Sequence, residues 1–232
     1  MKTRKTLFLL VFIPVFSWAQ TAFTNARVSI EASQVARALV VMDSCVHKNY
    51  YADSALFYSA LLHLKIGQVK QARKKYEQLS KFYPQFSERH YLNGLLFFSS
   101  QNYGKSIDEF NLAAKSDSHN PKLIYNRALA FGMLEEYLSA IEDLGTCIAL
   151  NPRYTQAYYS RGYWYEYTGN YVEAAKDYES VIRLDPKNYE AYIGLAYVYQ
   201  VQNETDKACK VLATAVKQGS QTAEELQEIF CK

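Results

Sequence analysis

Histidine and cysteine are the residue types best suited to hold a metal ion, and the chain has four of each. They are His47, His63, His90 and His119, and Cys45, Cys147, Cys209 and Cys231. Neither the histidines among themselves nor the histidines with the cysteines show a metal-ligand spacing. We therefore expect no metal site and no cofactor.

One short segment resembles part of a phosphate-binding loop. Gly104, Lys105 and Ser106 match the end of that motif, but the glycine required five residues earlier is Ser99. The chain also has no nucleophile elbow, no CxxC pair and no Gly-rich dinucleotide loop. These patterns predict a protein that is not an enzyme.

Small residues recur through the chain at intervals of 34 residues. One series is Ala60, Gly94, Ala128, Gly162 and Ala196, and a second is Ala72, Ser106, Ala140, Ala174 and Ala208. An aromatic residue or Leu follows each member of the second series after four residues, as at Tyr76 and Tyr178. Within each period, apolar residues are mostly three and four apart on both sides of a short polar or Gly-containing break. This periodicity predicts two helices per repeat, stacked so that neighbouring repeats share a core.

The repeat resembles the tetratricopeptide repeat family, whose pattern is W-x2-L-G-x2-Y, then A-x3-F, then P. The best copy, 155–188, matches at Tyr158, Gly162, Tyr165, Ala174, Tyr178 and Pro186. It departs from the pattern at Tyr158, where the family often has Trp, and at Arg161, where it usually has Leu. The resemblance implies an all-α fold, a right-handed α-solenoid (superhelix) of stacked antiparallel helix pairs.

The repeat register divides the chain into eight expected segments. They are a signal peptide at 1–19, an N-terminal helical region at 20–52 with a degenerate repeat as one option, five repeats at 53–86, 87–120, 121–154, 155–188 and 189–220, and a C-terminal capping helix at 221–232.

The segment 1–19 has the features of an export signal. A basic start with Lys2, Arg4 and Lys5 precedes a short apolar run, and Ser17-Trp18-Ala19 forms a small-x-small cleavage site. We expect export to the periplasm or the exterior, cleavage before Gln20, and no membrane insertion afterwards.

Helices are also predicted at both ends of the repeats. The spacing of Val28, Val35, Ala38, Leu39, Met42 and Cys45 predicts one amphipathic helix from about Arg27 to His47. At the other end, the capping helix is expected to turn Glu224, Glu225 and Glu228 outward and Leu226, Ile229 and Phe230 inward.

The four cysteines have two expected environments. Cys45 and Cys147 share one small-residue position three repeats apart, so we expect them to be buried and free. Cys209 and Cys231 lie on helices that should pack together, so a disulfide between them and two free thiols are both open.

Charge argues against partners that need a strong field. The net charge of +3 matches the three basic residues of the segment 1–19, so the remaining chain is neutral. This disfavours nonspecific binding to nucleic acid or to anionic membranes. Three of the charges of Lys70, Arg73, Lys74 and Lys75 lie on one helix face, which is either a solvated surface or a docking site for an acidic partner.

The resemblance also implies where a partner would bind. In this family the first helices line a concave face, and the second, fifth, ninth, twelfth and thirteenth residues of each repeat point into the groove. The partner-binding residues implied for this chain are Tyr91, Phe98, Tyr125, Tyr159, Tyr163, Tyr167 and Tyr197. Tyr125, Tyr159 and Tyr163 are expected to face only ligand or solvent, with a packing role as the alternative. Of the Lys and Asn set with which some relatives clamp a C-terminal carboxylate, only Lys122 and Asn126 are present.

Two functions remain open from the sequence. The first is a protein-interaction scaffold of the cell envelope that binds a peptide segment or a partner subunit in an aromatic groove. The second is a module that binds a glycan or peptidoglycan fragment through stacked Tyr rings.

Overall fold

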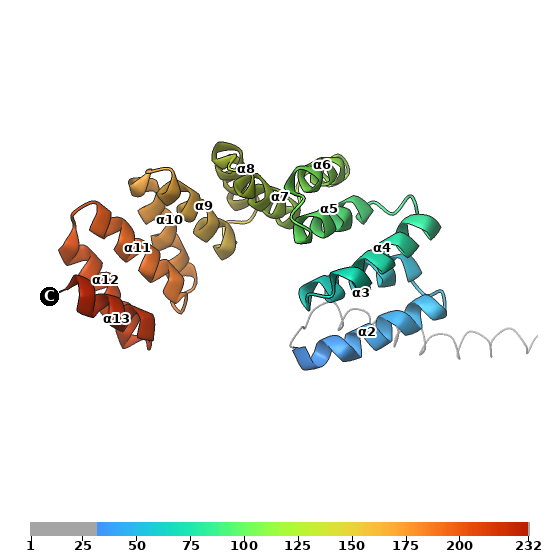
Figure 1. The fold of residues 1–232 in the computed structure, drawn as a ribbon, viewed down its shortest axis with the longest axis horizontal. Coiled ribbons are helices and arrows are strands. Elements are labelled where there is room, and N and C mark those ends of the chain that lie inside the picture. The colour runs from blue at the N-terminus through green and yellow to red at the C-terminus, as the bar shows by residue number, and fades with distance from the viewer. Residues whose placement is uncertain (1–31, 232) are drawn as a thin grey trace, which may run out of the picture. The chain divides into compact units, whose positions relative to one another are not determined.

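The computed structural model describes residues 32–231, which fold into twelve α-helices (Figure 1). Two compact units are present, one ending at Ala113 and one beginning at Ala114. The first unit contains α2 (Ala32–His47), α3 (Ala52–Lys65), α4 (Val69–Phe82), α5 (Arg89–Ser99) and α6 (Tyr103–Ala114). The second contains α7 (Pro121–Met133), α8 (Tyr137–Leu150), α9 (Thr155–Tyr167), α10 (Tyr171–Leu184), α11 (Tyr189–Val201), α12 (Thr205–Lys217) and α13 (Gln221–Phe230).

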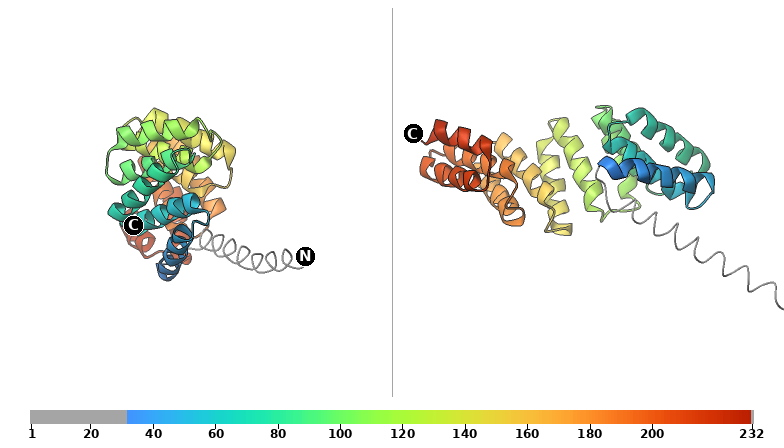
Figure 2. Two further views of the ribbon diagram at one scale, coloured as in Figure 1. Left: turned by 90° about the vertical axis from the view of Figure 1, so that its right-hand side faces the viewer. Right: turned by 90° about the horizontal axis from the view of Figure 1, so that it is seen from below.

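Within each unit the helices pack in chain order as antiparallel pairs (Figures 1 and 2). In the second unit the pairs are α7 with α8, α9 with α10, and α11 with α12. The first helices of these pairs also contact one another, α7 with α9 and α9 with α11. They therefore lie side by side, and we call the surface formed by α7, α9 and α11 the first-helix face. The all-α architecture of stacked helix pairs predicted from the sequence is confirmed.

Both series of small residues lie in the core. In the first series Ala60, Ala128 and Ala196 are at most 1% exposed, and in the second Ala72, Ala140, Ala174 and Ala208 are fully buried. Ser106 stands among these alanines and donates its hydroxyl to the backbone oxygen of Gly94 at 2.8 Å. The small side chains let paired helices approach closely, and Phe110 and Tyr178 fill the space beside them at 0% and 1% exposure.

The turn inside each helix pair needs a left-handed residue at one fixed place. Positive φ angles occur at Gly67, Gln101, Glu135, Gly169 and Asn203, which are 34 residues apart. Gly and Asn tolerate this backbone region, whereas Gln and Glu adopt it at a cost of about 1 kcal/mol or more. Glu135, with φ 64°, therefore occupies a place where three of the other four repeats use Gly or Asn.

Two helices flank the repeats. In α2, Val35, Ala38, Met42 and Cys45 are buried, as the amphipathic pattern predicts. In α13, Leu226 and Phe230 pack against the core formed by α11 and α12. Ile229 is 67% exposed, so its predicted inward orientation is wrong. The packed side of α13 is centred on the fully buried Ala223, and Ile229, six residues later at about 100° per residue, lies about 120° around the helix from it.

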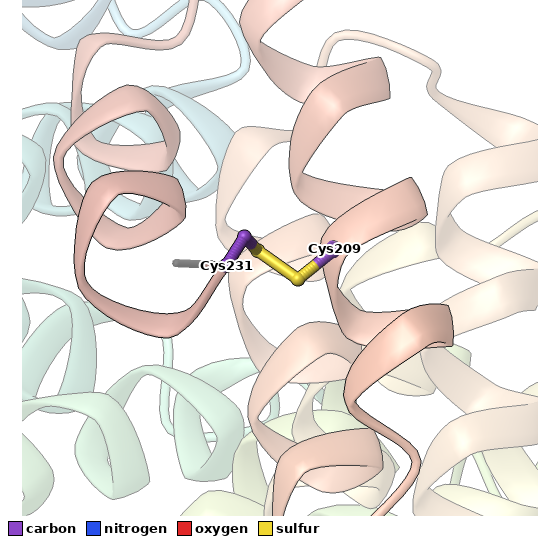
Figure 3. Close-up of a disulfide and its surroundings, with 2 residues drawn as sticks. All are labelled: Cys209 and Cys231. Atoms are coloured by element: carbon purple, nitrogen blue, oxygen red, sulfur yellow. A yellow bond between two sulfur atoms is a disulfide. The ribbon is translucent and has the colours of Figure 1, made fainter.

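The C-terminal helix is held covalently. A disulfide joins Cys209 on α12 to Cys231, which follows α13 directly, with the two Cα atoms 5.7 Å apart (Figure 3). Ser220 caps the start of α13 by accepting a hydrogen bond from the Ala223 amide at 3.2 Å. Cap and disulfide together tie both ends of α13 to the last repeat.

The predicted signal peptide at 1–19 and the first part of the region 20–52, including Val28, lie outside the described residues. Within residues 32–231, no helix has the length and apolar character that a bilayer crossing requires.

Candidate functional site

The seven predicted groove residues differ in exposure. Tyr163, Tyr167 and Tyr197 are exposed, at 43%, 62% and 47%. The other four, Tyr91, Phe98, Tyr125 and Tyr159, are half-buried. The family pattern therefore selects positions on first helices correctly, but only some of these positions have a ring free to meet a partner.

In the first unit the predicted groove residues pack against α6. The ring of Tyr91 lies 5.9 Å from that of Phe110, and the ring of Phe98 lies 5.3 Å from that of Tyr103. Tyr91 also packs against the buried cluster around Leu92. Their surroundings are those of packing residues.

In the second unit Tyr125 and Tyr159 have neighbours within the protein. The Tyr125 ring lies 5.1 Å from that of Tyr154, and its hydroxyl is 3.3 Å from Ser160 Oγ. Tyr159 packs against the core, 5.7 Å from the ring of Tyr178, and burial raises the pKa of its phenol. The expectation that Tyr125 and Tyr159 face only ligand or solvent is therefore wrong, because neighbouring helices fill the space beside both rings.

Tyr163 and Tyr167 belong to a cluster of four rings that we call the aromatic patch, completed by Tyr137 and Trp164. The Tyr163 and Trp164 rings are 4.8 Å apart, and the Tyr137 ring lies 5.3 Å from Trp164 and 4.9 Å from Tyr167. Tyr163 and Tyr167 are 6.5 Å apart on α9. Tilted and edge-on rings at these distances attract one another, so contacts with Trp164 and Tyr137 hold the exposed Tyr163 and Tyr167 in position.

Tyr137 and Trp164 were missed by the sequence analysis. Trp164 fits because Gly132 on α7 leaves room for it, and a Cβ at Gly132 would collide with the indole. The repeat register of Gly132 contained a signal for the place of Trp164. The residues equivalent to Gly132 are Leu64, Phe98, Glu166 and Gln200, so Gly132 is the one glycine of its series.

Apolar side chains continue the aromatic patch along the chain. Met133 and Leu134 follow Gly132, and Leu138 follows Tyr137. Their exposed fractions are 50%, 41% and 82%. The end of α7, the start of α8 and the end of α9 thus present apolar and aromatic side chains that the rest of the second unit leaves exposed.

Acidic groups influence the aromatic side chains. A hydrogen bond to Tyr167 raises the pKa of Tyr137 to about 12, and the negative charge of Glu135 contributes in the same direction. Further along α9, Glu166 accepts a hydrogen bond from the Tyr178 hydroxyl at 2.7 Å. Burial raises the pKa of Glu166 above its ordinary value, although this hydrogen bond opposes the shift. Carboxylates therefore lie beside the aromatic side chains at two places, in the turn before Tyr137 and on α9.

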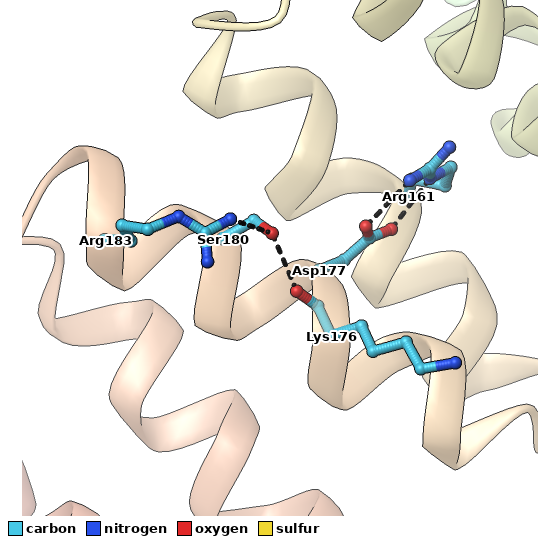
Figure 4. Close-up of polar contacts among 5 residues, drawn as sticks. All are labelled: Arg161, Lys176, Asp177, Ser180 and Arg183. Atoms are coloured by element: carbon cyan, nitrogen blue, oxygen red, sulfur yellow. Dashed lines mark hydrogen bonds and ion pairs between the residues drawn. The ribbon is translucent and has the colours of Figure 1, made fainter.

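Two arginines of first helices are held in ion pairs with the second helices. Arg161 on α9 donates to Asp177 on α10, Nε to Oδ2 and Nη2 to Oδ1, at 2.8 Å each (Figure 4). Arg127 on α7 makes the same paired contacts to Asp143 on α8, at 2.8 and 2.7 Å. Their positive charges are thus neutralised within their own helix pairs.

The Arg161–Asp177 pair gains two hydrogen bonds but buries a carboxylate. The hydrogen bond to Asp177 raises the pKa of Arg161, whereas burial raises the pKa of Asp177 despite the arginine. We conclude that the pair is ionic at neutral pH because Arg stays protonated, and that the carboxylate depends on it because it is only 4% exposed.

The remaining cysteines are not part of a site. Cys45 and Cys147 are buried and free, as expected. Burial raises the pKa of Cys147 to about 12. A thiol in this state is a poor nucleophile at neutral pH.

An open pocket of about 310 Å³ lies among α10, α11 and α12. Ile182, Leu195 and Val211 form its apolar floor, and none of the predicted groove residues lines it.

Comparison with protein families identifies three segments, each with the description tetratricopeptide repeat. They are residues 54–85, 125–188 and 168–228, which together cover more than half of the chain.

Known proteins agree with these matches. The chain is 27% identical over 134 residues to U-box domain-containing protein 70 of Oryza sativa subsp. japonica. The aligned region covers 55% of this chain and 17% of that relative. The crystal structure of MamA matches with 25% identity and a TM-score of 0.62, over 70% of this chain and 95% of MamA. The structure of YrrB, described as a tetratricopeptide repeat protein with an unusual peptide-binding site, has 19% identity and a TM-score of 0.62, over 81% of this chain and 97% of YrrB. The chain thus spans most of these two structures but less than a fifth of the curated relative.

Proposed function

Because the chain is a tetratricopeptide repeat protein, built from a non-enzymatic interaction module, we propose that it binds a peptide segment or partner subunit on its first-helix face. The observation that carries the proposal is the exposure of Tyr163 and Tyr167 on α9, at 43% and 62%, above rings that fix their positions.

Tyr suits this role for physical reasons. It offers a large apolar face and a hydroxyl while losing little side-chain entropy on binding. Buried aromatic anchors also contribute most of the free energy in many protein interfaces. Tyr197 on α11, 47% exposed, adds a further aromatic side chain to the same face.

The second unit is favoured over the first as the binding site. In the first unit Tyr91 and Phe98 pack against α6, so their rings contribute to stability. In the second unit the aromatic patch adjoins the exposed Met133, Leu134 and Leu138. A contiguous apolar surface of this kind is typical of an interaction site.

A selection experiment tests the proposal. The protein is immobilised and a library of random peptides of about 10 residues, long enough to cross adjacent helices when extended, is selected against it. We expect peptides whose binding falls at least about tenfold with Tyr163→Ala or Tyr167→Ala and is unchanged with Lys176→Ala on the exposed part of α10. The proposal fails if the selected peptides bind the Tyr variants as well as the parent. Binding of glycan fragments but no peptide, with the same Tyr dependence, would favour the glycan function instead.

We also propose that the protein is exported and acts in the cell envelope or outside the cell. The proposal rests on the basic start, short apolar run and cleavage site in residues 1–19. The intact mass of the protein from its native cells tests it. Loss of residues 1–19 supports export, and a cytoplasmic product that retains Met1 contradicts it.

A further inference from the structure

The charge of the second unit is opposite to that of the first. Residues 114–231 contain sixteen Asp and Glu against eleven Lys and Arg, whereas residues 32–113 contain six against ten. In the second unit, two of the eleven basic side chains are Arg127 and Arg161, which pair with Asp143 and Asp177. These pairs also neutralise two acidic groups, so the excess of five acidic residues is carried by the other fourteen.

Two of the acidic residues adjoin the aromatic patch. Glu135 and Glu136 form the turn between α7 and α8, directly before Tyr137, and both are exposed. Neither makes an ion pair within residues 32–231. The turn therefore places two unneutralised carboxylates beside the exposed apolar and aromatic side chains.

The backbone of Glu135 is strained. Its φ of 64° lies in the left-handed region, where the equivalent turns at Gly67 and Gly169 use glycine. A glycine there would relieve the backbone strain but remove a carboxylate next to the patch. Gln101 adopts the same conformation at the equivalent turn of the first unit, so the carboxylate, and not the strain, is particular to the turn at Glu135.

The exposed Tyr rings favour a cationic group, as the two carboxylates do. The face of a Tyr ring carries negative electrostatic potential and attracts an ammonium or guanidinium group. Within this protein Arg161 already lies over aromatic rings in this way, 5.9 Å from Tyr158 and 5.8 Å from Tyr165. Tyr163 and Tyr167 present their rings to solvent instead.

We propose that the aromatic patch binds a segment of a partner protein that carries Arg or Lys beside an apolar side chain. The cationic group lies over Tyr163 or Tyr167 and against the carboxylates of Glu135 and Glu136, and the apolar side chain covers Leu134 or Leu138. The inference rests on the proposed function and adds the chemistry of the partner to it. The guest is the electrostatic opposite of a ligand held by a carboxylate clamp.

Two labelled peptides of equal length test this proposal directly. One carries Leu-Arg-Leu-Arg between Gly-Ser ends, the other carries Leu-Glu-Leu-Glu, and their binding to the full chain is followed by fluorescence anisotropy. We expect the Arg peptide to bind at least about tenfold more tightly at low salt, and the preference to shrink as salt rises. Tyr167→Leu, which keeps an apolar side chain but removes the π face, should weaken the Arg peptide about threefold or more.

Matched variants separate a local charge effect from net charge. Glu135→Gln with Glu136→Gln should weaken the Arg peptide about fivefold, whereas Glu224→Gln with Glu225→Gln, the same change of charge on α13, should leave it unaltered. Glu135→Gly should raise the melting temperature and still lower this affinity. Gln101→Gly, at the equivalent turn of the first unit, should raise the melting temperature without changing the affinity.

The outcomes distinguish this inference from the function on which it rests. If both peptides bind equally and Tyr167→Ala weakens both, the binding face stands and the preference for a cation is wrong. If the Arg peptide fails to bind at about 1 mM, or if both pairs of Gln variants lower its affinity equally, the inference of a cationic partner segment is also wrong. If Tyr167→Ala leaves the binding of every peptide unchanged, the binding face itself is wrong.

Discussion

Arg161 and Asp177 form a two-point ion pair that joins the two helices of one repeat, with both N–O distances at 2.8 Å. The residues 34 positions later are Leu195 and Val211, which line the floor of one pocket. The same pair of positions is therefore ionic in one repeat and apolar in the next, although the helices pack in the same way.

This substitution can be reproduced by mutation. Arg161→Leu leaves the Asp177 carboxylate buried without its partner and should cost about 3 to 5 kcal/mol of unfolding free energy. Arg161→Leu with Asp177→Val copies the next repeat and should recover most of that loss. Urea unfolding of the two variants measures the difference. A double variant no more stable than Arg161→Leu alone would show that the pair does not act as a unit.

Gly162 should not accept a larger side chain. A Cβ at this position would lie 3.2 Å from both Asp177 Cβ and Tyr178 Cε1. Gly162→Leu should therefore overpack the contact between α9 and α10 and cost about 1 to 3 kcal/mol or more. Lys176→Leu on the exposed side of α10 is the control. Equal melting temperatures for the two variants would contradict this packing.

The disulfide should stabilise the C-terminal helix. Cys209 and Cys231 are 22 residues apart, and closing a loop of this size contributes about 3 kcal/mol in the chain-entropy model. Cys231→Ser should lower the melting temperature and raise the number of titratable thiols in the denatured protein from two to three. Four thiols in parent protein purified without reductant would show that the bridge is absent.

Glu166 should make stability depend on pH in a defined direction. Its folded-state pKa is raised by burial above the unfolded-state value. The folded protein therefore binds this proton more tightly, and the resulting stabilisation, present at low pH, is lost as the pH rises through the folded-state pKa. Glu166→Gln removes the titration while keeping an acceptor for the Tyr178 hydroxyl.

Relative to the parent, this variant should gain unfolding free energy between about pH 4 and about pH 7. The exposed Glu173→Gln on α10 is the control, and its difference from the parent should change little over that range. A relative loss for Glu166→Gln over that range would reverse the assigned direction of the pKa shift.

The repeat register made the fold predictable. Residues such as Ala128 and Ala174 must stay small because helices cross there, so their 34-residue spacing carries the packing directly. The ion pairs were not predicted. Arg127 and Asp143 are separated by 16 residues, as are Arg161 and Asp177, but such a spacing does not reveal that the charges meet or are buried.

The binding face was less predictable. Tyr159 and Tyr163 lie one helical turn apart on α9, yet one packs against Tyr178 and the other is exposed. This difference depends on where neighbouring rings pack, which a position in the repeat cannot specify. Trp164 likewise depends on a single glycine of the preceding repeat.

We propose that Tyr163 and Tyr167 bind a partner, whereas Tyr178 stabilises the fold. The most direct measurement is the affinity for a library-selected peptide beside the melting temperature, for Tyr163→Ala, Tyr167→Ala and Tyr178→Ala. We predict that the first two lose about thirtyfold in affinity with little change in melting, and that Tyr178→Ala loses about 3 to 5 kcal/mol of stability. Variants at Tyr163 and Tyr167 that melt early yet bind the peptide normally when folded would contradict the account.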